Sequence, residues 1–180
     1  MSDEETSALQ KRVDGIFLEQ PVFEYALIAA QELSFSDKVR YICENECDRY
    51  GKSWICGEHM PPLELCMARC LEFSHAVVFS TVSDGSGFSE QLAARRGHEE
   101  VTDCIAAGFE REFGEVLTLS TGCMLCESCA YPEPCRHPSK RRSTTESHGI
   151  LILNTAARHG LSFDCGENIV TYFSLVLFNA

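Results

Sequence analysis

Four of the eleven cysteines in this chain lie within thirteen residues, at the spacing C-x2-C-x2-C-x5-C. Three thiolates at C-x2-C-x2-C can ligate three corners of an iron–sulfur cubane, and in bacterial ferredoxins the fourth cysteine of such a run serves a second cluster. A tetrahedral zinc ion takes the same thiolate ligands, so the run alone leaves both metals open. We therefore predict a metal site at Cys123, Cys126, Cys129 and Cys135.

A second group of cysteines lies upstream, at the spacing C-x3-C-x8-C. This group lacks the paired C-x2-C knuckles that are usual in zinc modules. Its presence therefore favours iron–sulfur clusters of the 4Fe–4S type, with zinc as the alternative cofactor. It adds three predicted metal ligands, Cys43, Cys47 and Cys56.

Seven thiols are one fewer than two cubane clusters need. If the four downstream cysteines close one cluster, the upstream cluster keeps an open iron, a Lewis acid that can take water, a substrate or a small thiol. If Cys135 crosses over, the open position moves to the other cluster. A further alternative is that Cys66 or Cys70, spaced i, i+4 on an expected helix, supplies the eighth ligand. Such a pair is more often two buried core thiols, which is the interpretation we favour.

Basic residues follow the downstream cysteines in the run CRHPSKRR. Arginines beside a thiolate cluster would raise its reduction potential or hold an anionic substrate. A solvated basic loop explains them equally well. We predict anion binding by Arg136, Arg141 and Arg142.

Cys104 lies between Val101 and Ile105 on an expected helix, and we expect it to be a core residue.

Composition and charge narrow the class of protein. A chain of 180 residues with 44% hydrophobic residues is expected to form one soluble domain. The net charge is −12, whereas nucleic acids and anionic membranes bind proteins through positively charged surfaces. We therefore expect neither nucleic acid nor a membrane as a partner. The N-terminal run MSDEETSALQKR has no apolar segment for export, and no stretch is long enough to span a membrane. We expect a cytoplasmic protein whose thiols stay reduced and whose partner is a redox protein or a small molecule.

The pattern of apolar residues indicates the elements that position these side chains. Residues 1–20 form an expected polar N-terminal lead-in, and residues 21–180 form a single cysteine-rich metal-binding domain. The order of these elements predicts an α/β (or α+β) fold with a mixed sheet flanked by helices and cysteine-rich loops. That order is strand, long helix, strand, helix and strand. The expected segments are a strand or short helix over 22–33, helices over 61–73, 88–113 and within 144–160, and strands over 75–83, 115–121 and 168–178.

Three runs of the sequence, VRYICENECDRYGKSWIC, TGCMLCESCAYPEPCRHPSKRRSTTESHG and ENIVTYFSLVLF, resemble a cysteine-rich "predicted metal-binding protein" family, a bacterial and archaeal domain of unknown function. The resemblance runs from about Val39 to the C-terminus, and it implies that the seven cysteines named above are the ligands. The chain departs from the family pattern where Gly57 and Glu58 replace two prolines and where Thr144, Thr145 and Glu146 replace Ser-Met-Glu. The family name implies a cofactor and no reaction.

Three functions follow from these observations. Clustered thiolates without an evident acid–base pair favour an iron–sulfur protein of redox or electron-transfer function. The odd ligand count and the basic run favour an iron–sulfur enzyme with an open coordination site. If the cysteines bind zinc only to stabilise the fold, the chain is a zinc-stabilised interaction protein.

Overall fold

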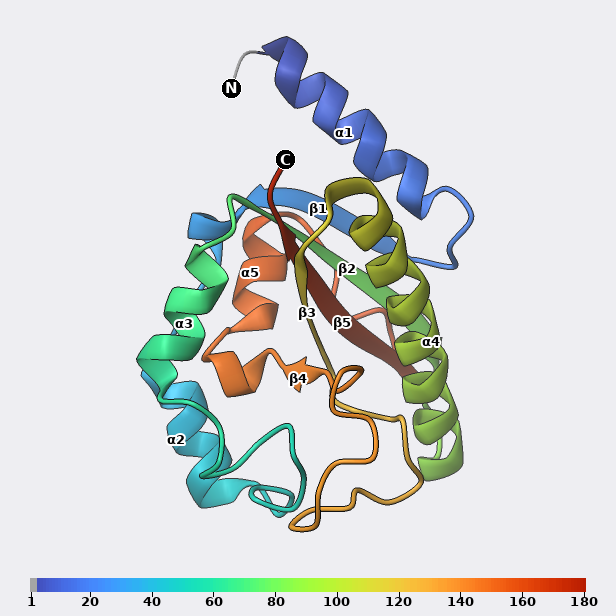
Figure 1. The fold of residues 1–180 in the computed structure, drawn as a ribbon. Helices are drawn as coiled ribbons and strands as arrows, with labels where there is room; N and C mark the ends of the chain where they lie inside the picture. The colour runs from blue at the N-terminus through green and yellow to red at the C-terminus, as the bar shows by residue number, and fades with distance from the viewer. Residues whose placement is uncertain (1–2) are drawn as a thin grey trace.

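A five-stranded mixed sheet with helices on both of its faces forms the body of the protein (Figure 1). The computed structural model describes residues 3–180. In chain order the elements are α1 (Asp3–Phe17), β1 (Glu24–Ala29), the 3-10 helix η1 (Ala30–Glu32), α2 (Asp37–Glu46), α3 (Leu63–Leu71), β2 (His75–Asp84), α4 (Phe88–Phe113), β3 (Val116–Ser120), β4 (Ser143–Thr144), the 3-10 helix η2 (Glu146–His148), α5 (Ile152–Arg158) and β5 (Ile169–Phe178). The α/β fold with a mixed sheet, predicted from the sequence, is confirmed.

The strands lie in the order β1-β2-β5-β3-β4. The long central pair β2 and β5 is antiparallel, with Val77 opposite Val176, and β1 and β3 extend the sheet antiparallel on either side. Only β4 runs parallel to its neighbour, where Ser143 pairs with Leu119 and Thr144 with Ser120. This parallel pair fixes both ends of the long loop between β3 and β4 to one edge of the sheet.

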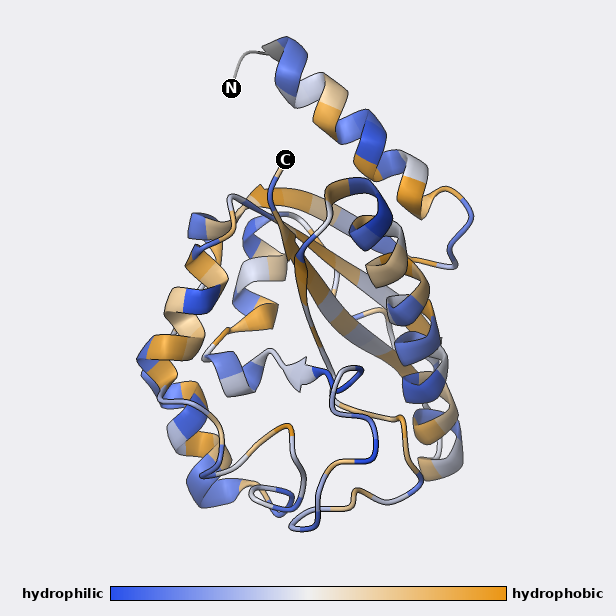
Figure 2. Cartoon of the chain, viewed as in Figure 1, coloured by the Kyte–Doolittle hydropathy of each residue, from blue (hydrophilic) through white to orange (hydrophobic). Residues whose placement is uncertain are grey.

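Alternating side chains of the central strands fill two separate cores, because successive residues of a strand point to opposite faces. On β2, Val77 and Phe79 pack with Ile105 and Phe109 of α4, while Val78 packs on the other face against residues of α3 and α5. Figure 2 shows the central strands coloured as hydrophobic and the helices mixed. Both faces of the sheet are therefore buried, as a three-layer arrangement requires.

The N-terminal segment is more ordered than its polar composition indicates. Residues 3–17 of the expected lead-in form α1, whose Leu9, Val13 and Phe17 are buried. Phe17 stacks on Tyr25, with ring centroids 4.2 Å apart. The apolar side chains recur every four residues, so α1 presents one narrow apolar stripe to the sheet while the rest of its surface stays polar.

Most other elements agree with the sequence pattern, and α4 and β5 do so to within a residue. The helix expected within 144–160 is split into η2 and the short α5. Residues 37–46, for which no helix was expected, form α2, whose N-cap Ser36 accepts a hydrogen bond from the amide of Lys38 at 3.3 Å. Within residues 3–180, no helix combines the length and the apolar composition needed to cross a membrane.

Candidate metal centre

All seven predicted cysteine ligands line one cavity of about 970 Å³. The cavity lies at the end of the molecule where α2, the first half of α4 and the loop between β3 and β4 meet (Figure 1). The two cysteine groups are far apart in the sequence, and the fold brings them to a common space. The members are Cys43, Cys47 and Cys56 from one side and Cys123, Cys126, Cys129 and Cys135 from the other.

Helix α2 and a tight turn position the first group. Cys43 lies in α2 and Cys47 is its C-cap. The Cys56 thiol lies 3.5 Å from the Ser53 hydroxyl and donates to the Arg49 carbonyl oxygen at 3.7 Å. Gly57 follows with a φ of 119°, and a Cβ there would lie 2.7 Å from the Gly51 Cα. A glycine is therefore required at position 57, because the backbone there passes close to the backbone of Gly51.

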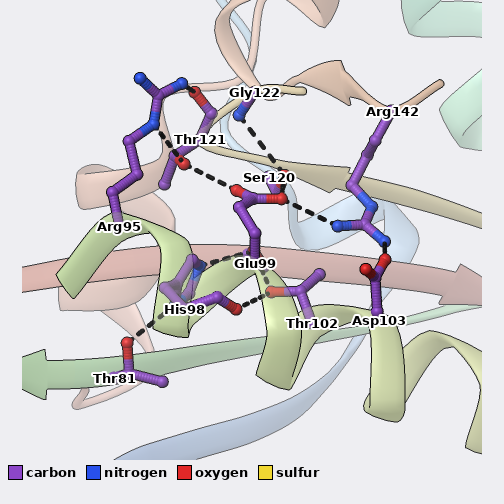
Figure 3. A network of polar contacts seen from close by, with 11 residues as sticks. Thr81, Arg95, His98, Glu99, Thr102, Asp103, Ser120, Thr121, Gly122 and Arg142 are labelled. Carbon is purple, nitrogen blue, oxygen red and sulfur yellow. Dashed lines mark hydrogen bonds and ion pairs between the residues drawn. The ribbon is translucent and has the colours of Figure 1, made fainter. Parts of the chain in front are cut away.

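One carboxylate holds both ends of the loop that carries the second group. Figure 3 shows Glu99 of α4 accepting hydrogen bonds from the hydroxyls of Ser120 at 2.8 Å and Thr121 at 2.7 Å. The same carboxylate pairs with the guanidinium of Arg142, with an Nη1–Oε2 distance of 2.8 Å. Ser120 and Thr121 precede the first cysteine of the loop and Arg142 follows the last. Glu99 therefore closes the base of the cysteine loop.

The entrance of this loop is sterically tight. Arg95 of α4 donates to the carbonyl oxygen of Thr121 at 2.7 Å and to its hydroxyl at 3.1 Å. Gly122 has a φ of 132°, and a Cβ on it would lie 2.7 Å from the Arg95 Nη2 atom and 2.9 Å from Ile55 Cδ1. Gly122 lets the loop pass between α4 and the segment of the first cysteine group, immediately before Cys123.

A second polar network lies beneath Glu99 and fixes α4 to the sheet (Figure 3). The buried His98 ring bonds through Nδ1 to Thr81 of β2 at 2.8 Å and through Nε2 to Ser174 of β5 at 2.7 Å. Burial lowers the pKa of His98 to about 4, and the charges of Arg142 and Arg95 act in the same direction. His98 is therefore neutral at physiological pH and serves as a fixed hydrogen-bonding bridge.

Aromatic rings join the two cysteine-bearing segments. Trp54, between Cys47 and Cys56, donates from its indole nitrogen to the Glu133 carbonyl oxygen at 2.8 Å. Its ring centroid lies 5.1 Å from that of Tyr131 and 5.0 Å from that of His59. Both ring nitrogens of His59 are buried with no hydrogen-bond partner among the described residues. These contacts join the segment between Cys47 and Cys56 to the loop between Cys129 and Cys135.

The Cys43 thiol lies in a setting that resists its ionisation. Burial raises the pKa of Cys43, and the negative charges of Glu146, Cys47 and Cys56 raise it further against the opposing charge of Arg40. Thiolates that repel one another in this way are stabilised by a metal cation, which is the form in which cysteine ligates.

Three further cysteines considered in the sequence lie outside the cavity. Cys66 and Cys70 are buried in α3 and do not line the cavity. Cys70 belongs to the apolar core, and Cys66 lies 3.9 Å from a guanidinium nitrogen of Arg40. Cys104 is exposed, so the expectation that it is a core residue was wrong. The buried stripe of α4 runs through His98, Thr102, Ile105 and Phe109, and position 104 lies off that stripe.

The three arginines predicted to bind an anion are also divided. Arg136 and Arg141 line the cavity, where Arg141 lies over the Trp54 ring at 5.9 Å from its centroid. Arg142 is 13% exposed and is paired with both Glu99 and Asp103. Its charge is therefore already neutralised within the chain, and its contacts hold the loop.

The donor set of the cavity matches a thiophilic metal group. All eleven cysteines are free thiols, and seven of them face one space. Among residues 3–180, no three Cys, His, Asp or Glu side chains are arranged so that they could hold a metal ion. The thiols thus line a cavity and are not already arranged around the position of a single metal ion. Soft thiolates without carboxylates among the predicted ligands fit iron–sulfur or zinc chemistry and do not fit magnesium or calcium.

Comparison with known proteins agrees with this donor set. The sequence model of a family described as "Predicted metal-binding protein (DUF2284)" matches residues 26–178. No curated protein and no solved structure matches the chain. The match includes every cysteine that lines the cavity.

Proposed function

The chain belongs to the predicted metal-binding protein family (DUF2284), and from that premise we propose that its seven gathered thiols hold one or two iron–sulfur clusters of the 4Fe–4S type that serve electron transfer. The observation that carries the proposal is the convergence of two cysteine groups, distant in sequence, on one cavity. The C-x2-C-x2-C spacing of the second group supports iron–sulfur ligation, and the first group lacks the spacing of a zinc knuckle.

Each cysteine group has its own place in this proposal. Cys123, Cys126, Cys129 and Cys135 ligate one cluster, and Cys43, Cys47 and Cys56 ligate the other. Bound there, such a group supplies one-electron transfer at a potential set by its protein surroundings. The chain tunes that potential through the guanidinium groups of Arg95, Arg96 and Arg141, which line the same cavity and favour the more negative, reduced state.

The surrounding side chains also limit access of water. Ile55, which lines the cavity, is 8% exposed, and the Trp54 ring that also lines it packs against Tyr131 with ring centroids 5.1 Å apart. A lower local dielectric strengthens the interaction between the arginines and the thiolates. The proposed partner is a redox protein or a small molecule in the reducing cytoplasm, where the eleven free thiols would persist.

An iron–sulfur enzyme with an open coordination site is the second candidate. The observation that favours it is the burial of Cys66 and Cys70 in α3 outside the cavity, which leaves seven thiols for eight positions. An open iron would act as a Lewis acid toward a bound molecule. A zinc-stabilised interaction protein is the remaining alternative, and it predicts a colourless sample.

Electron transfer is tested by anaerobic reduction of the protein as purified. We expect broad sulfur-to-iron charge-transfer absorption in the visible region that bleaches on addition of dithionite and returns on mild reoxidation. Absorption that does not respond to reductant would contradict electron transfer while leaving the cluster in place. A colourless sample would contradict the cluster itself.

A further inference from the structure

One stripe of α4 lines the same cavity as the seven cysteines. Its members are spaced at i, i+3, i+4, i+7 and i+8, which places them on one face of a helix. They are Phe88, Gln91, Leu92, Arg95 and Arg96. The stripe has two chemically different ends, because Phe88 and Leu92 at its start are apolar and Arg95 and Arg96 at its end are cationic.

The apolar end is exposed to the cavity and to solvent. Phe88 is 76% exposed and Leu92 is 37% exposed, although both are large hydrophobic residues. Leu125, from the cysteine loop, lines the same cavity and is 38% exposed. Exposed apolar side chains gathered at a cavity mark a ligand site, and a volume of about 970 Å³ is in the range of small-molecule pockets.

The cationic end belongs to a local concentration of positive charge. Within the described residues, six of the chain's 15 lysines and arginines line the cavity, whereas two of its 27 acidic residues, Glu127 and Glu146, do so. The chain as a whole carries a net charge of −12. The fold therefore collects cations at this cavity against the overall balance.

Several of these cations have no partner within the protein. Arg49, Lys52 and Arg96 form no ion pair with any residue in the range 3–180. Arg96 also borders a smaller neighbouring cavity lined by acidic residues; Glu99 and Asp103 there are already paired with Arg142, and neither Glu100 nor Glu127 forms an ion pair with Arg96 in the described residues. The guanidinium of Arg96 thus remains available to a ligand, while that of Arg95 is held by Thr121.

The geometry points to a binding site for a small organic anion between α4 and the cysteine loops. Its apolar body lies against Phe88, Leu92 and Leu125, and its carboxylate or phosphate binds Arg96, which follows Leu92 by about 6 Å along the helix axis at 1.5 Å per residue. The inference rests on the proposed function in that the metal group held by the thiols would face this ligand across the cavity. The inference identifies the small-molecule partner of the proposed metal site as an organic anion with an apolar body.

The test uses the protein purified anaerobically with its metal and two probes with the same rings. 8-Anilinonaphthalene-1-sulfonate is an apolar anion, and N-phenyl-1-naphthylamine lacks the sulfonate. We expect calorimetric titration to show saturable binding of the sulfonate and much weaker binding of the neutral probe. Arg96→Gln should weaken sulfonate binding about tenfold, because a charged hydrogen bond is lost. Phe88→Ala should weaken the binding of both probes.

Matched variants control for changes remote from the cavity. Arg111→Gln removes an exposed arginine at the other end of α4, and Phe163→Ala removes an aromatic residue that is 51% exposed outside the cavity. Both should bind the sulfonate as the unmodified protein does. Equal weakening by Arg96→Gln and Arg111→Gln, or equal affinity for the two probes, would overturn the inference.

Iron and sulfide analysis of the same samples separates this inference from the proposed function. Iron retained without saturable, Arg96-dependent binding would remove the anion site and leave the iron–sulfur proposal standing. Stoichiometric zinc with intact, Arg96-dependent binding would remove the iron–sulfur proposal and leave the anion site.

Discussion

Glu99 and Arg142 form a buried ion pair that ties the far end of the cysteine loop to α4, with an Nη1–Oε2 distance of 2.8 Å and side-chain exposures of 8% and 13%. Since Glu99 also accepts hydrogen bonds from Ser120 and Thr121, it joins the start of the loop to its end. The second cysteine group is therefore positioned by a residue that is not itself a ligand.

Replacing Glu99 should damage both stability and metal retention. Glu99→Gln removes the buried partner of Arg142 and leaves only the exposed Asp103 to pair with it, which is expected to cost about 3 kcal/mol of unfolding free energy. Asp103→Asn is the matched control, because Asp103 is 60% exposed and pairs with the same arginine. That change should cost about 0–1 kcal/mol. Urea unfolding and metal analysis measure both effects, and equal losses in the two variants would refute the role given to Glu99.

The cysteines should separate into ligands and bystanders. Cys126→Ser is expected to lose a metal group and much of the stability of the loop, since a loop without a core of its own depends on its metal. Cys104→Ala should keep full metal content and change stability by no more than about 0.5 kcal/mol, because Cys104 is exposed. Metal analysis and urea unfolding of both variants decide the matter. Similar metal loss from both variants would show that the division is wrong.

Two glycines offer a paired test of the loop entrance. Gly122→Ala places a Cβ at a φ of 132° against Arg95 and Ile55, and should cost about 1–3 kcal/mol. Gly97→Ala lies in α4 with open space around its Cβ, and should stabilise the protein by about 0.5–1 kcal/mol. Thermal unfolding of the two variants is sufficient. Opposite signs are expected, and a neutral Gly122→Ala would contradict the close approach.

Acid should weaken the attachment of α4 to the sheet. His98 has a folded-state pKa of about 4, below its ordinary value of 6.5, so the unfolded chain binds its proton first as the pH falls. The stability held above about pH 6.5 is therefore lost as the pH falls toward 4, by up to about 1.4 kcal/mol per pH unit. Burial also lowers the pKa of His75 and of His148, which adds in the same direction.

Replacement of the ring isolates the contribution of His98. His98→Gln keeps a neutral polar side chain and removes the titration. Its unfolding free energy should be lower at pH 7 than that of the unmodified protein but should fall less between pH 7 and pH 5. An unchanged pH slope would assign the acid sensitivity to other groups.

The local pattern of the sequence predicted the elements of the sheet well. The helix expected over 88–113 forms α4, and the strand expected over 75–83 forms the central strand β2. The apolar neighbours of Cys104 predict a core position for it, whereas the buried stripe of α4 follows the helical period through Thr102 and Ile105 and leaves position 104 exposed. The apolar period of α1 was hidden by the charged residues between its members.

The sequence predicted the cysteines of the candidate site but not the tertiary contacts that position them. The seven cysteines were selected by their spacing, which is a local property of the sequence, and all of them line one cavity. The Glu99–Arg142 pair joins residues 43 positions apart, so it depends on tertiary contacts that no local pattern encodes. The Phe88, Leu92 and Arg96 stripe was missed although its i, i+4, i+8 spacing was visible, since such a stripe is more often read as a solvated or core face.

Quantification of iron, acid-labile sulfide and zinc per chain in anaerobically purified protein tests the central claim most directly. If the seven thiols around the cavity hold iron–sulfur clusters, iron and sulfide will be present in equal amounts, and zinc will be far below one per chain. Stoichiometric zinc without sulfide, in a colourless and fully folded protein, would contradict the account.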